Sequence, residues 1–538
     1  MLRSSPRRGA AHLPALCLAL LASACDSPTE GGRNPTATGS VPLVNFDAAG
    51  RPLVRFDVAG DQVDAHGGEI RWFEDRYYMY AETYGCGFEW HKLAPAPFCG
   101  FRVYSSPNLV EWTDHGLLFD VSQWEPWQRR CNWWSNGCFR PHVAYNPATR
   151  KYVLWVNVYD APVGYYVLES DTPTGPFVER GVPRLAFNNE GLQGRINNGD
   201  HNLFVDDDGT GYIVYTEWAQ GNGDVVVERL TPDFLSGTGT HVRLGVSRTE
   251  APSLFKRAGR YYITIGDPNC AYCETNTVYL TAPSPLGPWS ERKRISSTSC
   301  GGQPGHVSRL PTPDGGSWYL YQSDLWLNSD GRDGGDLNQA PASQFWAPLE
   351  FDASGGIQPI TCEREYRVDA VVKAPPQGPP DVRRLQCDVG PGPGGRALAR
   401  EFRFTAAGTG RLRSLSLPTY QRGEPDAPLV FELRAAGGAA GPVLGRASID
   451  ADAGGWDVPV NISWAGRRLE VPLDVTVQAG AEYALSARSA TTQGCYGFAY
   501  GPEGAAGLAT AWSSPDGSAA WAAESGPGVR VDLAFAGN

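Results

Sequence analysis

Five copies of one hairpin pattern between residues 45 and 360 limit the fold more than any other feature of the sequence. Each copy has an apolar stretch, a turn of Asp, Gly or Pro residues, and a second stretch rich in Tyr and Val, which is typical of antiparallel strands. Helical periodicity is nearly absent, so we predict an all-β region. A repeat of this length indicates a propeller or a solenoid. The hairpins begin at Ile70, Val143, Leu203, Leu254 and Arg309.

A second pattern recurs between the hairpins, with a third strand, a turn and an outer strand. Four strands in each of five units favour a five-bladed β-propeller, because radial packing lets each twisted sheet bury both faces without a long free edge. A β-helix would need shorter and more uniform repeats. We therefore predict a propeller over residues 45–372. The copies of the second pattern begin at Val103, Val167 and Tyr279.

A proline-rich segment, residues 373–381, has the composition of a stiff linker, and we place a domain boundary there. Residues 382–538 contain alternating polar and apolar stretches, such as LVFELRAA and EYALSARSA. This alternation predicts a C-terminal β-sandwich.

The N-terminus has the features of an export signal. The basic MLRSSPRR precedes LPALCLALLA, an apolar run too short to span a bilayer. The sequence LASAC ends at Cys25 and resembles a bacterial lipoprotein cleavage box, although simple cleavage after Ala24 also fits. We expect a signal peptide over residues 1–24, a flexible linker over 25–44, and a protein held by a lipid on Cys25 at a membrane, in the periplasm or on the cell surface.

The charge and the cysteines limit the partners and the compartment. A net charge of −12 without a basic run argues against nucleic acid or anionic lipid as partners. Ten cysteines remain beyond Cys17 and Cys25, and an even number in an exported protein favours disulfides. A lone CxxC without a second pair is a weak metal signal. The pairs that sequence spacing suggests are Cys86 with Cys99, Cys131 with Cys138, Cys270 with Cys273, and Cys387 with Cys495.

Ionisable residues precede all five hairpins. In a propeller the first strand of each blade lines the central channel, so residues at its start converge. Polar side chains there would be costly in a packed core unless they face water or a ligand. We predict a functional ring at the propeller axis, made of His66, Arg140, Asp200, Glu250 and His306.

The ring contains two carboxylates and no Ser or Cys nucleophile, and no cluster has zinc-ligand spacing. Cleavage of a glycosidic bond needs a carboxylic acid whose pKa is kept high, and a neighbouring charge can do this. Asp200, one blade from Glu250, can be that neighbour. We interpret the ring as the site of a glycoside hydrolase.

With these residues, the sequence resembles glycoside hydrolase family 43 over about residues 60 to 360. The resemblance implies a five-bladed propeller with inverting chemistry, Glu250 as the general acid and Asp200 as the residue that modulates its pKa. The motifs that carry it are AHGG at 65–68, SPNLVEW at 106–112, RPHVAYN at 140–146, DHNLFVDDDG at 200–209 and EAPSLF at 250–255.

One departure from the family pattern is informative. The usual catalytic base is an Asp that opens the first blade, and here His66 stands in that position. The AHGG opening is similar to the branch that contains exo-β-1,3-galactanases, in which a glutamine on the last blade is proposed to hold the attacking water. Gln303 matches that glutamine. Phe139 departs from this branch, which usually has a glutamate there.

The resemblance also indicates residues that bind substrate. Arg140, His66 and Glu82 belong to the pocket, and His306 resembles an axial histidine that binds water or a cation. Glu69 stands where relatives usually have Gly, and we weigh a place in the sugar subsite, a role as alternative base and a position on a surface loop. Asp324 and Trp326 are further candidates. Trp134 represents the tryptophans of an insertion in blade one, Cys86 to Cys138, that could stack on sugar rings.

No cofactor is required by this chemistry, although the resemblance leaves room for a structural calcium ion. The predicted partner is an oligo- or polysaccharide. Three functions stay open: a galactan 1,3-β-galactosidase-like enzyme first, an α-L-arabinofuranosidase or β-xylosidase second, and a non-catalytic carbohydrate-binding propeller third. The C-terminal sandwich binds carbohydrate or serves as a stabilising spacer.

Overall fold

The computed structural model describes residues 37–86, 98–123, 126–131, 137–159, 163–187, 198–218, 220, 222–267, 275–326, 342–391, 397–422, 425–435, 441–450, 464–501, 508–514, 521–523 and 528–536. Within these ranges almost every element is a β-strand, and the helical elements are η1 (Val121–Gln123) and α1 (Pro126–Cys131). No helix in the described ranges combines the length and apolar character that a membrane span needs. Cys25 and Trp134 lie outside the described residues, as do Cys270 and Cys273.

The predicted five-bladed propeller is confirmed. Antiparallel sheets follow one another along the chain, four strands in each of the first four and three described strands in the fifth. Blade 1 has β3 (His66–Phe73), β4 (Arg76–Glu82), β5 (Phe101–Ser106) and β6 (Thr113–Leu117). Blade 2 has β7 (Cys138–Asn146), β8 (Lys151–Val158), β9 (Gly164–Ser170) and β10 (Val178–Gly181). Blade 3 has β11 (Asn198–Val205), β12 (Gly211–Glu217), β13 (Asp224–Leu230) and β14 (Gly237–Arg243). Blade 4 has β15 (Glu250–Arg257), β16 (Arg260–Asp267), β17 (Asn276–Ala282) and β18 (Lys293–Ser296), and blade 5 has β19 (Gln303–Pro311), β20 (Ser317–Asp324) and β21 (Gln344–Pro348).

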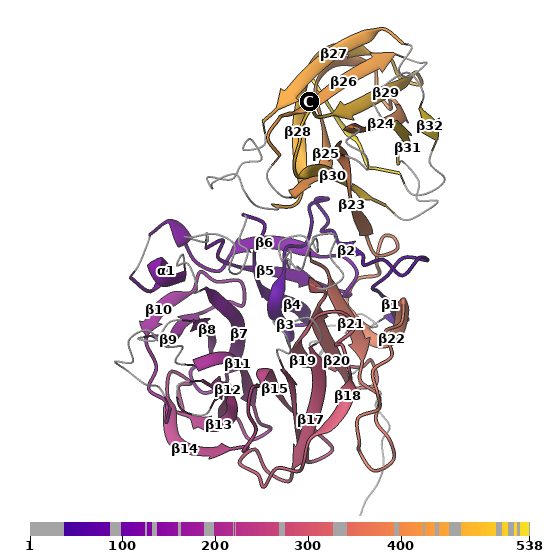
Figure 1. Cartoon of the computed structure of the whole chain (residues 1–538). Coiled ribbons are helices and arrows are strands. Elements are labelled where there is room, and N and C mark those ends of the chain that lie inside the picture. The colour runs from indigo at the N-terminus through magenta and orange to yellow at the C-terminus, as the bar shows by residue number, and fades with distance from the viewer. Residues whose placement is uncertain are drawn as a thin grey trace, which may run out of the picture. The chain divides into compact units, whose positions relative to one another are not determined.

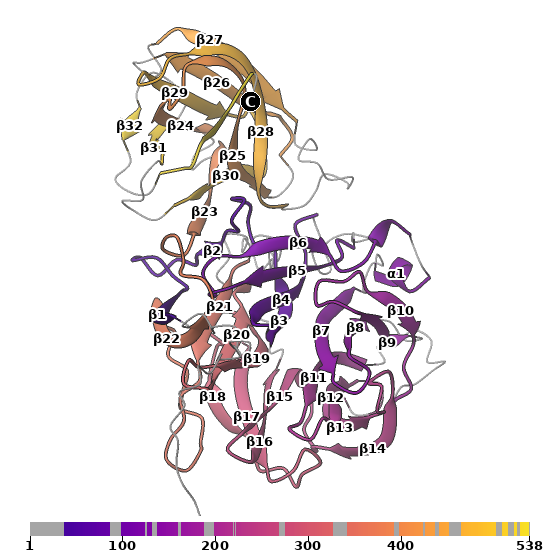
Figure 2. The same ribbon diagram turned by 180° about the vertical axis from the view of Figure 1, so that it is seen from behind.

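The five inner strands form a closed circle. Each of β3, β7, β11, β15 and β19 contacts the next, and β19 contacts β3. Figures 1 and 2 show these strands facing one another around the middle of the propeller. Hydrophobic clusters fill the spaces between neighbouring blades, as Val143, Leu154 and Leu168 of blade 2 do against Tyr80 and Val103 of blade 1. The openings of the inner strands therefore meet at one axis, as the repeat predicts.

The expected flexible linker over residues 25–44 is wrong at its C-terminal end. Residues Ala37–Val44 form β1, which pairs antiparallel with β22 (Glu365–Val372) along its whole length. Val41 and Leu43 are buried with residues of blades 1 and 5, so the chain has an apolar reason to be ordered here. The two-residue strand β2 (Val54–Arg55) follows.

The expected insertion from Cys86 to Cys138 is also partly wrong, because β5 and β6 of blade 1 lie inside it. Trp112 and Trp127 of this stretch are buried in the propeller core, so they do not form a stacking platform for sugars. Three predicted disulfides are confirmed, Cys86–Cys99, Cys131–Cys138 and Cys387–Cys495. A fourth, Cys300–Cys362, joins cysteines that are far apart in the sequence.

A second set of strands follows the proline-rich segment, since β22 ends at Val372 and β23 begins at Val382. The strands pair in the connected order β27, β26, β29, β24, β23, β30, β25, β28, with β31 and then β32 branching from β24, and β33 also on β25. Phe402, Leu415 and Phe431 belong to one hydrophobic core formed by these strands, and the β-rich fold is consistent with the predicted sandwich. The strands are β23 (Val382–Pro391), β24 (Ala397–Thr405), β25 (Gly410–Arg422), β26 (Leu429–Ala435), β27 (Val443–Ile449), β28 (Trp464–Val477), β29 (Glu482–Arg488), β30 (Cys495–Tyr500), β31 (Thr510–Ser514), β32 (Ala522–Ala523) and β33 (Asp532–Phe535).

Candidate active site

Every inner strand has a β-bulge at its opening. The ladder register shifts between His66 and Glu69 in β3, and at the matching place in β7, β11, β15 and β19. Bulges occur next to active sites because they turn a side chain out of the normal alternation. Each of the five predicted ring residues lies within such a bulge. Their distances from the point where regular pairing resumes differ from blade to blade, and the residues are His66, Arg140, Asp200, Glu250 and His306.

Four polar residues from four blades form one hydrogen-bonded row, which we call the acid cluster: Asp200, Arg140, Gln303 and Glu250. Arg140 Nη2 donates to Asp200 Oδ2 at 3.0 Å and to Gln303 Oε1 at 2.9 Å. Gln303 Nε2 then donates to Glu250 Oε2 at 2.7 Å. The structure thus brings together all three residues that the sequence predicts to be catalytic.

Backbone geometry holds the acid cluster in place. Arg140 and Ala251 have positive φ values of 55° and 51°. The Arg140 N–H donates to Glu82, beside the cluster. The Ala251 N–H donates to Asp200 Oδ2 at 2.9 Å. Burial acts to lower the pKa of Arg140, but the carboxylates of Asp200 and Glu82 outweigh it, so the pKa is raised and the guanidinium stays charged. Glu250 keeps 9% of its surface exposed, so the row reaches solvent at this residue.

His66 forms a pair with Asp64, which stands just before the AHGG motif and was not predicted from the sequence. His66 Nε2 lies 3.2 Å from Asp64 Oδ1, and the His66 ring stacks on Tyr84 with 4.6 Å between centroids. Asp64 also accepts hydrogen bonds from the Thr83 hydroxyl and from the backbone N–H groups of Tyr84 and Gly85. Burial acts to lower the pKa of His66, but Asp64 outweighs it and raises the pKa. His66 is therefore a buried ring whose position and pKa are set by a fixed carboxylate.

Glu82 is a second buried carboxyl beside the acid cluster. Its Oε1 accepts the Arg140 N–H at 2.5 Å, and Tyr84 donates its hydroxyl to Oε2. Burial raises the pKa of Glu82 by more than the charge of Arg140 lowers it, and the resulting pKa is about 8. Glu82 is thus protonated at neutral pH in the folded protein.

This protonation makes Glu82→Gln a mild substitution. The amide has the shape of the protonated carboxyl and needs no proton uptake on folding, so we expect the variant to be at least as stable as the wild type at pH 6. A carboxyl whose folded pKa is raised contributes stability that is full below its unfolded pKa and is lost as pH rises through about 8. Urea unfolding of both proteins at pH 6 and pH 9 measures this. The wild type should lose more stability than the variant at pH 9, and equal losses would contradict the protonated state.

Behind the acid cluster lies the axial cluster: Glu69, Arg71, His142 and His306. Glu69 Oε1 accepts the Val143 N–H at 2.7 Å, and Arg71 Nη2 lies 2.7 Å from Glu69 Oε2. The same oxygen lies 2.9 Å from His142 Nδ1 and 3.5 Å from His306 Nε2. Glu69 is fully buried, so a position on a surface loop is wrong; the bulge in β3 directs its side chain to the axis.

The axial cluster has the spacing of a metal site, because one ligand atom each from Glu69, His142 and His306 lies within 4.8 Å of the others. Two imidazoles and one carboxylate do not fit the structural calcium ion that the resemblance leaves open, since Ca²⁺ takes six to eight oxygen ligands. Arg71 also supplies positive charge to Glu69 at the place where an ion would bind.

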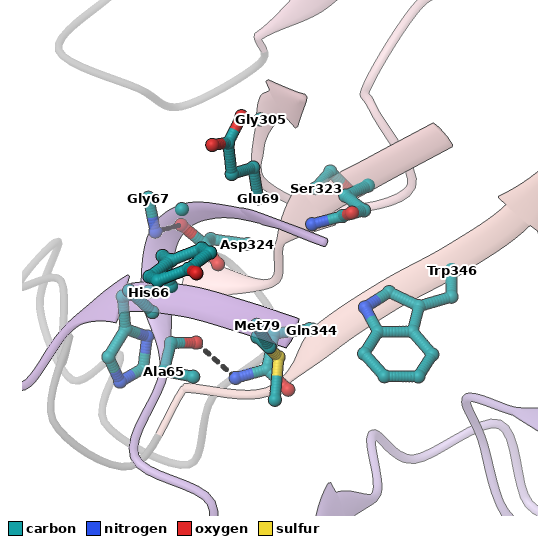
Figure 3. A pocket seen from close by; sticks show the side chains of 14 residues that line it. Ala65, His66, Gly67, Glu69, Met79, Gly305, Ser323, Asp324, Gln344 and Trp346 are labelled. Atoms are coloured by element: carbon teal, nitrogen blue, oxygen red, sulfur yellow. Dashed lines mark hydrogen bonds between the residues drawn. The ribbon is translucent and has the colours of Figure 1, made fainter. Parts of the chain in front are cut away.

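A small cavity between blades 1 and 5 borders His66, with room for about one water molecule. Asp324, at the end of β20, lines it and accepts the Gly67 N–H at 2.8 Å through Oδ2. Figure 3 shows the Asp324 carboxylate against the Gly67 backbone and Gln344 against Ala65. Trp326 lies just beyond β20 and is 7% exposed.

Several neighbours of the site were missed although their letters stand inside the motifs. His142 belongs to RPHVAYN and contacts Glu69, and His201 belongs to DHNLFVDDDG and packs edge-on against His142. Tyr159 packs against Phe139, and burial together with the charges of Glu250 and Asp200 raises the pKa of its hydroxyl. A motif shows which residue types recur, but the bulges decide which of them faces the acid cluster.

Three comparisons with known proteins bear on this site. Residues 69–336, about half of the chain, match the family model described as glycosyl hydrolases family 43. A β-D-galactofuranosidase of Aspergillus niger is 28% identical over 274 residues, which cover 49% of this chain and 75% of that protein. An arabinoxylan arabinofuranohydrolase of Bacillus subtilis is 27% identical over 215 residues, covering 35% of this chain and 41% of that protein.

Among solved structures, an exo-β-1,3-galactanase from Clostridium thermocellum has a TM-score of 0.51 at 20% identity, and the match covers 80% of this chain and 100% of that chain. At this identity the likeness shows a shared fold. The matched family range, residues 69–336, contains the whole acid cluster.

Proposed function

Because the chain belongs to glycosyl hydrolase family 43 and is a glycoside hydrolase, we propose that it releases terminal sugars from β-1,3-linked galactan with inversion at the anomeric carbon. The observation that carries this proposal is the row from Asp200 through Arg140 and Gln303 to Glu250. In this row the Glu250 carboxyl lies on the side of the solvent, and the charged groups of Arg140 and Asp200 lie behind it.

In the proposed reaction Glu250 is the general acid. It gives a proton to the oxygen of the leaving sugar while a water molecule attacks the anomeric carbon from the opposite face. Gln303 orients the Glu250 carboxyl through Oε2 and contributes to holding the water. Asp200 sets the charge around Glu250 through Arg140.

The galactan preference is supported by the AHGG opening and by Gln303, which the chain shares with the galactanase branch that it resembles. A second candidate is an α-L-arabinofuranosidase or β-xylosidase. Its support comes from sequence relatives named as a galactofuranosidase and as arabinofuranohydrolases.

A panel of substrates tests the proposal. We expect galactose from β-1,3-galactan oligosaccharides, and the α-anomer should appear first in NMR spectra recorded during turnover because the reaction inverts. Release of arabinose or xylose from arabinoxylan fragments, without galactose release, would favour the second candidate. Binding of sugars without any turnover would reject the hydrolytic proposal.

We also propose that the protein is exported and carries a lipid on Cys25. The disulfides within the described residues support an oxidising compartment, because cytosolic thiols are kept reduced. Fractionation of cells that express the full chain tests this. Cys25→Ala should move the protein from the membrane to the soluble fraction, and an unchanged distribution would reject the anchor.

A further inference from the structure

The proposed function does not yet assign a residue as the general base, the group that accepts the proton from the attacking water. Inversion requires a base opposite the acid, usually a second carboxylate. Gln303 can hold a water, but its amide is neutral and its Oε1 already accepts from Arg140. A neutral amide is a poor proton acceptor, so Gln303 alone does not complete the reaction.

His66, which stands at the position of the usual base, does not fit this role either. It is 1% exposed, and its Nε2 is paired with Asp64. Both of its ring nitrogens are buried, so neither can meet a water molecule at the sugar.

Asp324 is the carboxylate that lies next to Gln303. The two residues are direct partners in the ladder between β19 and β20. Partners of this kind carry their side chains on the same face of the sheet, with Cβ atoms about 4.5–5.5 Å apart. Because Gln303 also bonds to Glu250, one side chain stands between the two carboxyl groups. Inversion needs a gap of this kind, since the water must fit between acid and base.

The Asp324 carboxylate retains capacity to accept a proton. Its Oδ2 accepts the Gly67 N–H, and within the described part of the chain no other group donates a hydrogen bond to it. The residue is 5% exposed and borders the water-sized cavity.

The charges around Asp324 suit a base. Burial raises its pKa, and the positive charges of His66 and Arg140 offset only part of this effect. Glu82 also faces it, as a protonated group at neutral pH. A base whose pKa lies above that of an ordinary Asp accepts a proton more readily near neutral pH.

We propose that Asp324 is the general base of the inverting reaction, an inference that rests on the proposed function. The water gives a proton to Asp324 while its oxygen bonds to the anomeric carbon. The bond from that carbon to the leaving oxygen breaks, and Glu250 gives its proton to that oxygen. Asp324 ends the step protonated and Glu250 ionised, and exchange with solvent restores both.

Paired variants and two substrates test the base. An aryl galactoside with a good leaving group, such as dinitrophenyl β-galactoside, needs little help from the acid but still needs the base. Asp324→Ala should therefore lose about 10³-fold in kcat on both this substrate and a galactan oligosaccharide. Sodium azide should restore turnover of the aryl substrate by Asp324→Ala and give α-galactosyl azide, because azide attacks without losing a proton.

Asp324→Asn keeps an acceptor for the Gly67 N–H and should lose activity to the same extent while its thermal unfolding stays near that of the wild type. Asp314→Asn is the matched control, since Asp314 lies in the exposed turn of the same hairpin and should keep full activity. Activity of Asp324→Asn within tenfold of the wild type would overturn the proposal, as would a folded Asp324→Ala that azide does not rescue. If the wild type turns over galactan with inversion, either of these two results rejects only Asp324 as the base and leaves the proposed function intact. If the wild type turns over no substrate of the panel, the proposed function itself is rejected.

Discussion

Glu250→Gln is expected to lower kcat on a galactan oligosaccharide by about 10³-fold, because the amide cannot donate a proton to the leaving oxygen. Glutamine keeps the size of the side chain and an oxygen that accepts from Gln303 Nε2, so the acid cluster should remain assembled. The affinity for galactose should change little. Steady-state rates and calorimetric titration with galactose measure the two effects separately.

The leaving group provides an internal check on this prediction. On a dinitrophenyl galactoside, Glu250→Gln should lose much less activity than on the oligosaccharide, in contrast to Asp324→Ala. Glu291→Gln makes the same chemical change at an exposed position of blade 4 and should behave as the wild type. A Glu250→Gln enzyme that retains full activity on the oligosaccharide would show that another group is the acid.

Glu69→Gln is expected to destabilise the propeller by about 3 kcal/mol at pH 7. The amide can still accept from Val143, but its N–H₂ group then faces the Arg71 guanidinium. A buried cation that loses its partner is costly. The double variant Glu69→Gln/Arg71→Gln should recover part of the loss, because the unpaired charge is gone. Urea unfolding of the wild type, Glu69→Gln, Arg71→Gln and the double variant gives the coupling free energy between the two side chains.

The loss caused by Glu69→Gln should also depend on pH. Burial acts to raise the pKa of Glu69, but Arg71 and His142 outweigh it and hold the pKa well below its ordinary value. A carboxylate with a lowered folded pKa contributes stability above its unfolded pKa of about 4.3, and this contribution is lost as pH falls below that value. The difference between wild type and variant should shrink from pH 7 to pH 3.5. A constant difference would mean that the charge of Glu69 contributes nothing.

Glu69 and Glu82 thus give opposite expectations for the same substitution, although both are buried glutamates of blade 1. The difference comes from their partners, since Glu69 contacts Arg71 directly while Glu82 is bonded by an N–H and a hydroxyl. Their sequence contexts give no hint of this contrast.

The blades could be predicted because each hairpin is local. Strand, turn and strand lie within about fifteen residues, so the repeat is visible in the sequence. Strand β1 was missed because its partner β22 is more than 300 residues away, and a short apolar stretch beside Gly and Thr resembles the spacer before it. Long-range pairing leaves no local pattern.

The residue types of the site could be predicted from the sequence, but most of the hydrogen bonds and ion pairs between them could not. The sequence places Asp200, Glu250 and Gln303 at the axis, and the structure joins them through Arg140. The pairing of His66 with Asp64 and the burial of Glu69 depend on the bulge in β3, whose register shift the letters do not reveal.

The pairing of β1 with β22 has a consequence for how the protein is made. The partner of β1 is synthesised more than 300 residues after it. At typical rates of synthesis the delay between the two strands is on the order of half a minute. Until then the cluster around Val41 and Leu43 lacks the apolar residues of β22, Val368, Ala370 and Val372. Nascent chains that stop before Glu365 should therefore aggregate more readily and be cleaved faster by proteases than the longer chain. Synthesis of β22 is thus the step after which the native packing around β1 can form.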